Sequence, residues 1–119
     1  MKEDNVVREK SYAFALRVVK LAKWLQSEKK EFVLSKQLLR SGTSVGANVE
    51  EAIGGQSERD FLSKMSIAYK EALESHYWLR LLHDSGELSD TQFNSIIQDR
   101  DELLKLTGSI CKTLRKKNS

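Results

Sequence analysis

The sequence of 119 residues has no proline, a single cysteine and few aromatic residues, which make up 8% of the chain. Because proline interrupts helices, its absence favours long, uninterrupted ones. Cys111 has no second cysteine to pair with, so nothing indicates an oxidising compartment. No apolar run approaches the roughly 20 residues that a membrane-spanning helix needs, and the opening MKEDNVVREK is too charged for a signal peptide. We therefore expect a soluble cytoplasmic protein that has no membrane partner.

Charge is plentiful but unevenly distributed. Charged residues make up 31% of the chain and the formal net charge is +3. Residues 84–102 carry six acids against one arginine, whereas residues 105–119 carry no acid and five basic side chains, namely Lys105, Lys112, Arg115, Lys116 and Lys117. Such a basic tail attracts phosphate backbones, but it also occurs as a solvated end that favours a helix C-terminus. Both interpretations stay open on charge alone.

Apolar residues recur with helical spacing in four segments, at about residues 5–29, 33–53, 58–84 and 90–114. Two of these segments have clear start signals, because Ser57 can cap the third helix and Ser89 with Gln92 forms a capping box for the fourth. Short connections between long helices make neighbours antiparallel. We therefore predict one domain over residues 1–119, an all-α up-down-up-down four-helix bundle with a short basic C-terminal tail.

The first segment is apolar on two sides. Val7 and Phe14 follow the heptad seam of a bundle core, while Tyr12, Leu16 and Val19 lie well round the same helix. A bundle of this size cannot cover both sides with its own helices. We therefore predict self-association, with Tyr12, Leu16 and Val19 at the contact between subunits.

The stretch SGTSVGANVE, residues 41–50, combines glycines and hydroxyls inside a helical pattern. It is not a P-loop, because no lysine follows the second glycine and no strand precedes it. Each glycine costs about 1 kcal/mol relative to alanine within a helix, so a compensating interaction is expected. Gly42 and Gly46 are four residues apart and would let another helix approach closely. Close packing is our prediction, and a binding role is the alternative.

Polar side chains beside this stretch suggest an interior network. Buried charges need partners, so Arg40 or Arg100 could pair with glutamates of the second and third helices. The candidate members are Arg40, Ser41, Ser44, Asn48, Glu51, Glu71, Glu74 and Arg100.

Paired carboxylates on helices could instead act as general acid and base or as metal ligands. A di-metal bundle uses Glu-x-x-His motifs, whereas Leu73 stands three residues before His76 and Arg80 stands three residues before His83. Cys111 also lacks companions that would make it a nucleophile. We therefore predict that the protein is not an enzyme and has no catalytic residues, metal site or cofactor.

The residues from LLRSGTSVGANVEEAIGG to ESHYWLRLLHDSGEL carry a resemblance to a known family. Arg40-Ser41, Ser44, Gly46-Ala47-Asn48, Glu51 and the HYWLRLL that follows Glu74 resemble the core signature of the 23S ribosomal RNA intervening-sequence proteins, also called bacterial four helix bundle proteins. Many members have proline in place of Ala47 and alanine in place of Glu50, so this chain is similar to the GANVEEA branch.

The resemblance implies a bundle that assembles into a ring-like homopentamer. Members are encoded within insertions in large-subunit ribosomal RNA genes or elsewhere in bacterial chromosomes. A related group, the accessory variability proteins of diversity-generating retroelements, has the same fold and uses a basic pentamer to bind a reverse transcriptase and nucleic acid.

Two hypotheses follow for the function. The first is a non-enzymatic homo-oligomer that binds structured RNA or DNA through clustered cations, with Lys10, Arg17, Lys20, Lys112, Arg115, Lys116 and Lys117 as candidates. The second is a scaffold or accessory subunit that binds a partner protein and no nucleic acid.

Overall fold

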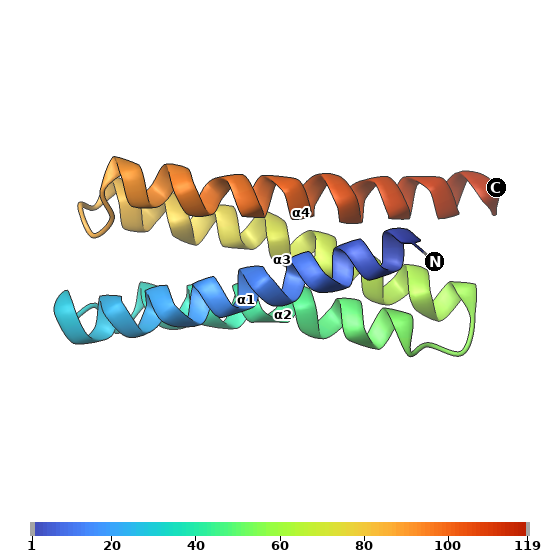
Figure 1. Ribbon diagram of the computed structural model, residues 1–119, viewed down its shortest axis with the longest axis horizontal. Coiled ribbons are helices and arrows are strands. Elements are labelled where there is room, and N and C mark those ends of the chain that lie inside the picture. Colours follow the sequence, from blue (N-terminus) through green and yellow to red (C-terminus); the bar gives the residue numbers. More distant parts are fainter. Residues whose placement is uncertain (1, 119) are drawn as a thin grey trace.

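The computed structural model describes residues 2–118, which form four helices and no strand. The helices are α1 (Lys2–Glu28), α2 (Leu34–Ile53), α3 (Glu58–Asp84) and α4 (Asp90–Lys117). Each runs antiparallel to the next, and together they form a rod of 47 × 21 × 21 Å with both chain ends at the same end (Figure 1). The predicted four-helix bundle is confirmed. Compared with the predicted bounds, α1 begins three residues earlier and α4 continues three residues further.

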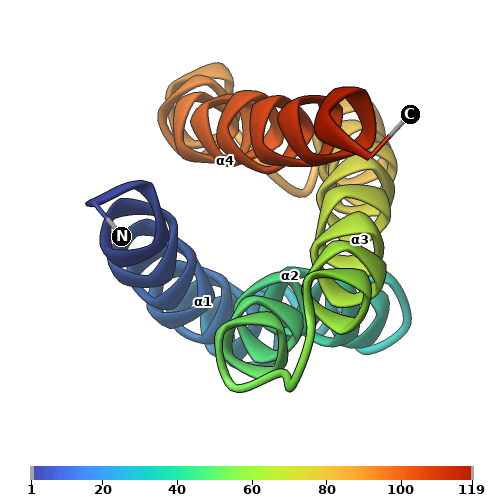
Figure 2. The same ribbon diagram turned by 90° about the vertical axis from the view of Figure 1, so that its right-hand side faces the viewer.

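The core consists of one apolar stripe from each helix. Phe14 and Leu25 of α1 lie fully buried, as do Leu38 of α2, Leu79 of α3 and Leu103 of α4. Three edges of the bundle are closely packed, whereas the fourth edge, between α1 and α4, has the least contact and the widest gap between neighbouring helices (Figure 2). No helix within residues 2–118 is long and apolar enough to cross a membrane.

Close contact between α1 and α2 depends on the two glycines of the small-residue stretch. A Cβ atom at Gly42 would lie 2.7 Å from a methyl carbon of Val18, and one at Gly46 would lie 3.3 Å from the main-chain oxygen of Ser11. Both glycines are buried in the interior of α2. The close approach predicted for this stretch is therefore present, and its partner is α1.

Local polar contacts set the helix ends. The Ser57 hydroxyl accepts from the Asp60 N–H at the start of α3, and Ser89 with Gln92 forms a reciprocal capping box at the start of α4. Gly86 has a φ of 88° in the turn between these two helices. Only glycine adopts this left-handed conformation without strain, so it reverses the chain there.

Candidate nucleic-acid interface

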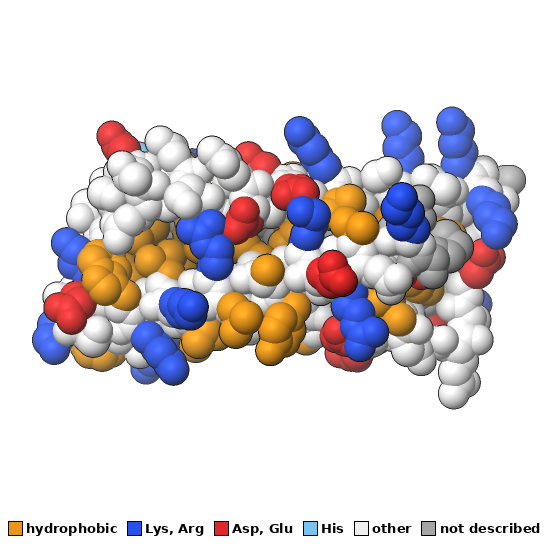
Figure 3. Space-filling view, viewed as in Figure 1, with side chains coloured by type: hydrophobic (Ala, Val, Ile, Leu, Met, Phe, Trp, Pro, Cys, Tyr) orange, Lys and Arg blue, Asp and Glu red, His pale blue; other side chains and the backbone are white. Residues whose placement is uncertain are grey.

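The C-terminal half of α4 presents lysines to solvent. Lys105, Lys112 and Lys116 are exposed, and their spacing of seven and four residues places them on the same side of the helix. With a rise of 1.5 Å per residue, their attachment points span about 16 Å. No acid occurs from residue 103 to residue 118. Lys and Arg side chains project from this part of α4 in Figure 3. We refer to these three lysines as the α4 lysine face.

Arg115 and Lys117 hold the end of α4 against α3. Arg115 Nη2 donates to Ser66 Oγ at 3.0 Å, and Lys117 Nζ donates to Glu58 Oε1 at 2.8 Å. The hydrogen bond with Glu58 raises the pKa of the exposed Lys117 amine. These two cations are thus partly engaged within the subunit, unlike Lys112, which makes no ion pair within residues 2–118.

Cations of α1 are neutralised by the acids of α4. Lys10 Nζ lies 2.7 Å from Glu102 Oε1, and this hydrogen bond raises the pKa of the Lys10 amine. The Arg17 guanidinium donates to the Asp99 carboxylate at 2.8 Å and to Ser95. These contacts bridge the loosely packed α1–α4 edge. Of the three α1 candidates, only Lys20 is exposed without an ion pair in the described part of the chain.

The charged residues of α2 and α3 meet at the edge between these helices rather than in the core. Arg40 contacts Glu71 at 3.2 Å and also contacts Glu74, which accepts from Trp78 Nε1 at 2.8 Å. The Arg40 side chain is 48% exposed. Ser41 and Ser75 are both buried, and the Ser41 hydroxyl accepts from the Ser75 hydroxyl at 3.1 Å.

The other candidate members of the network form separate contacts. The Asn48 amide donates to the Ser44 carbonyl oxygen at 2.9 Å, and Glu51 pairs with Lys64 at 3.0 Å. Arg100 donates to Asp101 on its own helix and contacts none of the candidate glutamates. The structure therefore brings Arg40, Glu71 and Glu74 together and leaves Arg100 apart.

Apolar side chains face solvent on α1 and on α3, and Phe32 and Val33 are exposed on the connection between α1 and α2. Tyr12 and Leu16 are 65% and 47% exposed on α1, beside a groove of about 220 Å³ shared with α2, and Val19 is partly buried. We name this the α1 apolar face. Leu73 and Tyr77 are exposed on α3 and form the α3 apolar face. Sequence reasoning missed the second surface, although the four-residue spacing of two apolar residues outside the core seam could have revealed it.

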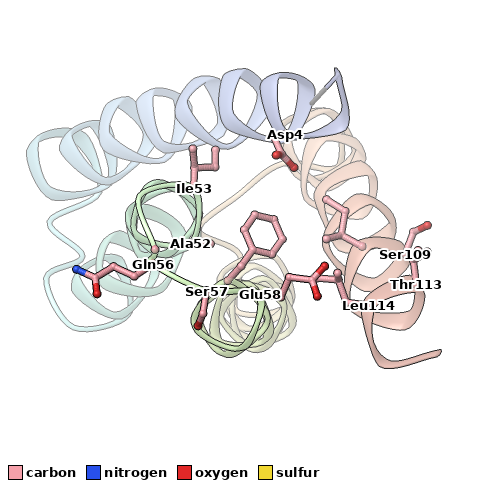
Figure 4. A pocket seen from close by; sticks show the side chains of 12 residues that line it. Asp4, Ala52, Ile53, Gln56, Ser57, Glu58, Ser109, Thr113 and Leu114 are labelled. Atoms are coloured by element: carbon pink, nitrogen blue, oxygen red, sulfur yellow. The ribbon is translucent and has the colours of Figure 1, made fainter. Parts of the chain in front are cut away.

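A pocket of about 490 Å³ lies at the end of the bundle that holds both chain ends. Phe61, Ile110 and Leu114 give it an apolar lining, and the carboxylates of Asp4 and Glu58 contribute to its wall (Figure 4). Residues 2–118 contain no group of three His, Cys, Asp or Glu side chains that could hold a metal ion.

The fold and its surfaces define an all-α bundle with a basic face on its last helix. Residues 3–109 match the family described as 23S rRNA-intervening sequence protein, and the chain belongs to this family. Among solved structures, a protein with unknown function from the S23 ribosomal protein family of Bacteroides thetaiotaomicron is 53% identical. The match covers 92% of this chain and 98% of that chain, with a TM-score of 0.91. No curated protein matches this chain.

Proposed function

We propose that this protein is a non-enzymatic, cytoplasmic homo-oligomer that binds structured RNA or another nucleic acid through the α4 lysine face. The observation that carries the proposal is the exposure of Lys105, Lys112 and Lys116 on one side of α4, within a stretch, residues 103–118, that contains no acid. Lysines that approach phosphates release condensed counterions, which drives binding without regard to sequence.

Self-association would repeat the α4 lysine face on one particle. The α1 and α3 apolar faces lie on helices that do not contact each other, so they point in different directions from the bundle. Two different surfaces on one chain favour head-to-tail contact between copies, and such contacts form a ring when the rotation closes. Five copies, the number that the family resemblance implies, would turn weak individual contacts into a multivalent surface.

The proposal is tested by titrating a labelled structured RNA and a duplex DNA with the full chain at low and physiological salt. We expect binding that weakens steeply with salt. Replacing Lys105, Lys112 and Lys116 together with glutamine should reduce the magnitude of the slope of log affinity against log salt by about 2 to 3 for each engaged subunit.

A matched control removes the same charge elsewhere. Lys30, Lys36 and Lys70 are exposed on the α1–α2 connection, α2 and α3, so their triple change to glutamine should lower affinity much less. Equal losses in both triple variants would show that net charge, and not the α4 lysine face, drives binding. An absence of binding at low salt would leave the scaffold as the function, with the apolar faces as its contact surfaces.

A further inference from the structure

Arg100 is the one charged residue among the side chains that the structure describes as buried, with 7% of its surface exposed. Its Nη2 donates to Asp101 Oδ1 at 2.5 Å, but its Nε finds no acceptor in the described part of the chain. A guanidinium stays charged in proteins, and burying a charge is unfavourable unless its partners compensate it. The Asp101 side chain is 51% exposed, so it compensates Arg100 incompletely.

The register of α3 against α4 identifies what lies opposite Arg100. The ring of Tyr69 lies 3.0 Å from the point where a Cβ of Gly108 would stand, and the ring of His83 stacks on Phe93 at 4.6 Å. In two antiparallel helices, residue numbers rise along one helix as they fall along the other. His76, midway between Tyr69 and His83, is therefore level with residues 100 and 101.

Charges of both signs lie near His76 in the α3–α4 seam, with Arg100 and Arg80 positive and Asp101 negative. Arg80 is exposed one turn beyond His76 on α3. Burial lowers the pKa of His76, and the charges of Arg100 and Arg80 lower it further, against a smaller opposing effect of Asp101.

We infer that the α3–α4 seam at Arg100 is a phosphate-binding site, with the Arg100 guanidinium as its anchor and His76 and Arg80 beside it. The planar guanidinium matches the geometry of a tetrahedral oxyanion. Asp101 can turn into solvent because its side chain is half exposed, and the oxyanion then takes its place on Arg100. The inference rests on the proposed function where the phosphate belongs to RNA or DNA, and a free oxyanion has the same chemistry.

Of the two histidines of the chain, His76 reports on this site and His83 is the internal control. Their imidazole signals are followed by NMR from pH 5 to 8 in the full chain, with sodium sulfate or with sodium chloride at equal ionic strength. A sulfate bound at Arg100 should raise the pKa of His76, because a nearby anion favours the charged imidazole. His83, about 10 Å further along α3, should titrate equally in both salts. An unchanged His76 titration would overturn the inference.

Variants separate binding from a structural role. Replacing a buried ionic side chain with an apolar one of similar size is often neutral for stability, so Arg100→Met should fold. In this variant the pKa of His76 should rise without sulfate, and sulfate should no longer shift it. Arg80→Gln changes an exposed side chain and gives a second measurement, with sulfate affinity expected to fall roughly two- to fivefold. A normal sulfate response in both variants would place the anion elsewhere.

Titration with the structured RNA distinguishes the source of the phosphate. If the phosphate is part of RNA, Arg100→Met should weaken RNA binding about tenfold, the loss expected for one charged hydrogen bond. If sulfate shifts His76 and no RNA binds, the site takes a free oxyanion and the proposed function fails alone. If RNA binds the wild type and Arg100→Met equally and sulfate has no effect, the inference fails and the proposed function stands.

Discussion

Substituting Gly42 by alanine tests whether close packing explains the glycines of α2. The new Cβ would lie 2.7 and 2.8 Å from the two methyl carbons of Val18, which is itself fully buried. Valine in a helix has one strongly preferred rotamer, so these methyl groups cannot easily turn away. Overpacking of this kind costs about 1 to 3 kcal/mol, whereas alanine gains about 1 kcal/mol in helix propensity. We therefore expect Gly42→Ala to lower the free energy of unfolding by about 1 kcal/mol.

A double-mutant cycle assigns this cost to the Val18 contact. Val18→Ala removes both methyl groups, each worth about 0.8 kcal/mol of burial, and leaves a cavity. The methyl group that Gly42→Ala introduces would then occupy part of that space. The double variant should therefore be more stable than the sum of the single effects predicts, by about 0.5 to 2 kcal/mol.

Urea unfolding followed by circular dichroism at one fixed protein concentration measures these differences, because self-association would shift the apparent stability. Gly54→Ala is the matched control, since its Cβ would meet nothing closer than 3.5 Å and its φ is an ordinary −80°. It should leave stability unchanged or raise it by about 0.4 to 1 kcal/mol. The packing argument is refuted if Gly42→Ala stabilises the protein as Gly54→Ala does.

Two further predictions concern pH and assembly. The hydrogen bond to Asp90 raises the pKa of His83, so its stabilising effect is complete below the ordinary value of about 6.5 and is lost as pH rises through the raised value. The unfolding free energy of the wild type relative to His83→Gln should thus fall between pH 6 and 8, and a constant difference would contradict this. For assembly, light scattering should give several times the 13.6 kDa chain mass. Leu16→Glu and Tyr77→Glu, one on each apolar face, should each lower it; a loss in only one variant would rule out contact between the two faces.

Periodicity predicted the four helices because each buries one stripe of side chains, a property that every turn of the helix repeats. The end of α4 could not be predicted in the same way. Arg115 and Lys117 extend the helix beyond the apolar pattern through contacts with Ser66 and Glu58, which lie more than 45 residues earlier in the chain. Such contacts depend on the packing of α4 against α3, and the local sequence does not contain that information.

Charge pairing between helices was equally hidden. In the sequence, Lys10 and Arg17 look like free cations, far from the acidic segment of residues 84–102. The antiparallel packing of α1 and α4 places them opposite Glu102 and Asp99. As a result, the acids of α4 neutralise α1 cations, and the positive charge of the last part of α4 stays exposed. Lys105 was named in the basic tail but not among the candidate nucleic-acid contacts, so the α4 lysine face was only partly predicted.

Helix order also explains why two arginines that looked equivalent differ. α2 lies against α3, so Arg40 reaches Glu71 and Glu74 on the side of α3 that faces α2. α4 contacts α3 and α1 but not α2, so Arg100 cannot reach the same carboxylates from its place in the core. Heptad register predicted that Arg100 would be buried, but only the arrangement of neighbours shows that it lacks a glutamate partner. An incompletely compensated cation in the core therefore lies on the same helix as the exposed lysines but on its other side, since the spacing turns Lys105, Lys112 and Lys116 by about 120° to 160° from Arg100.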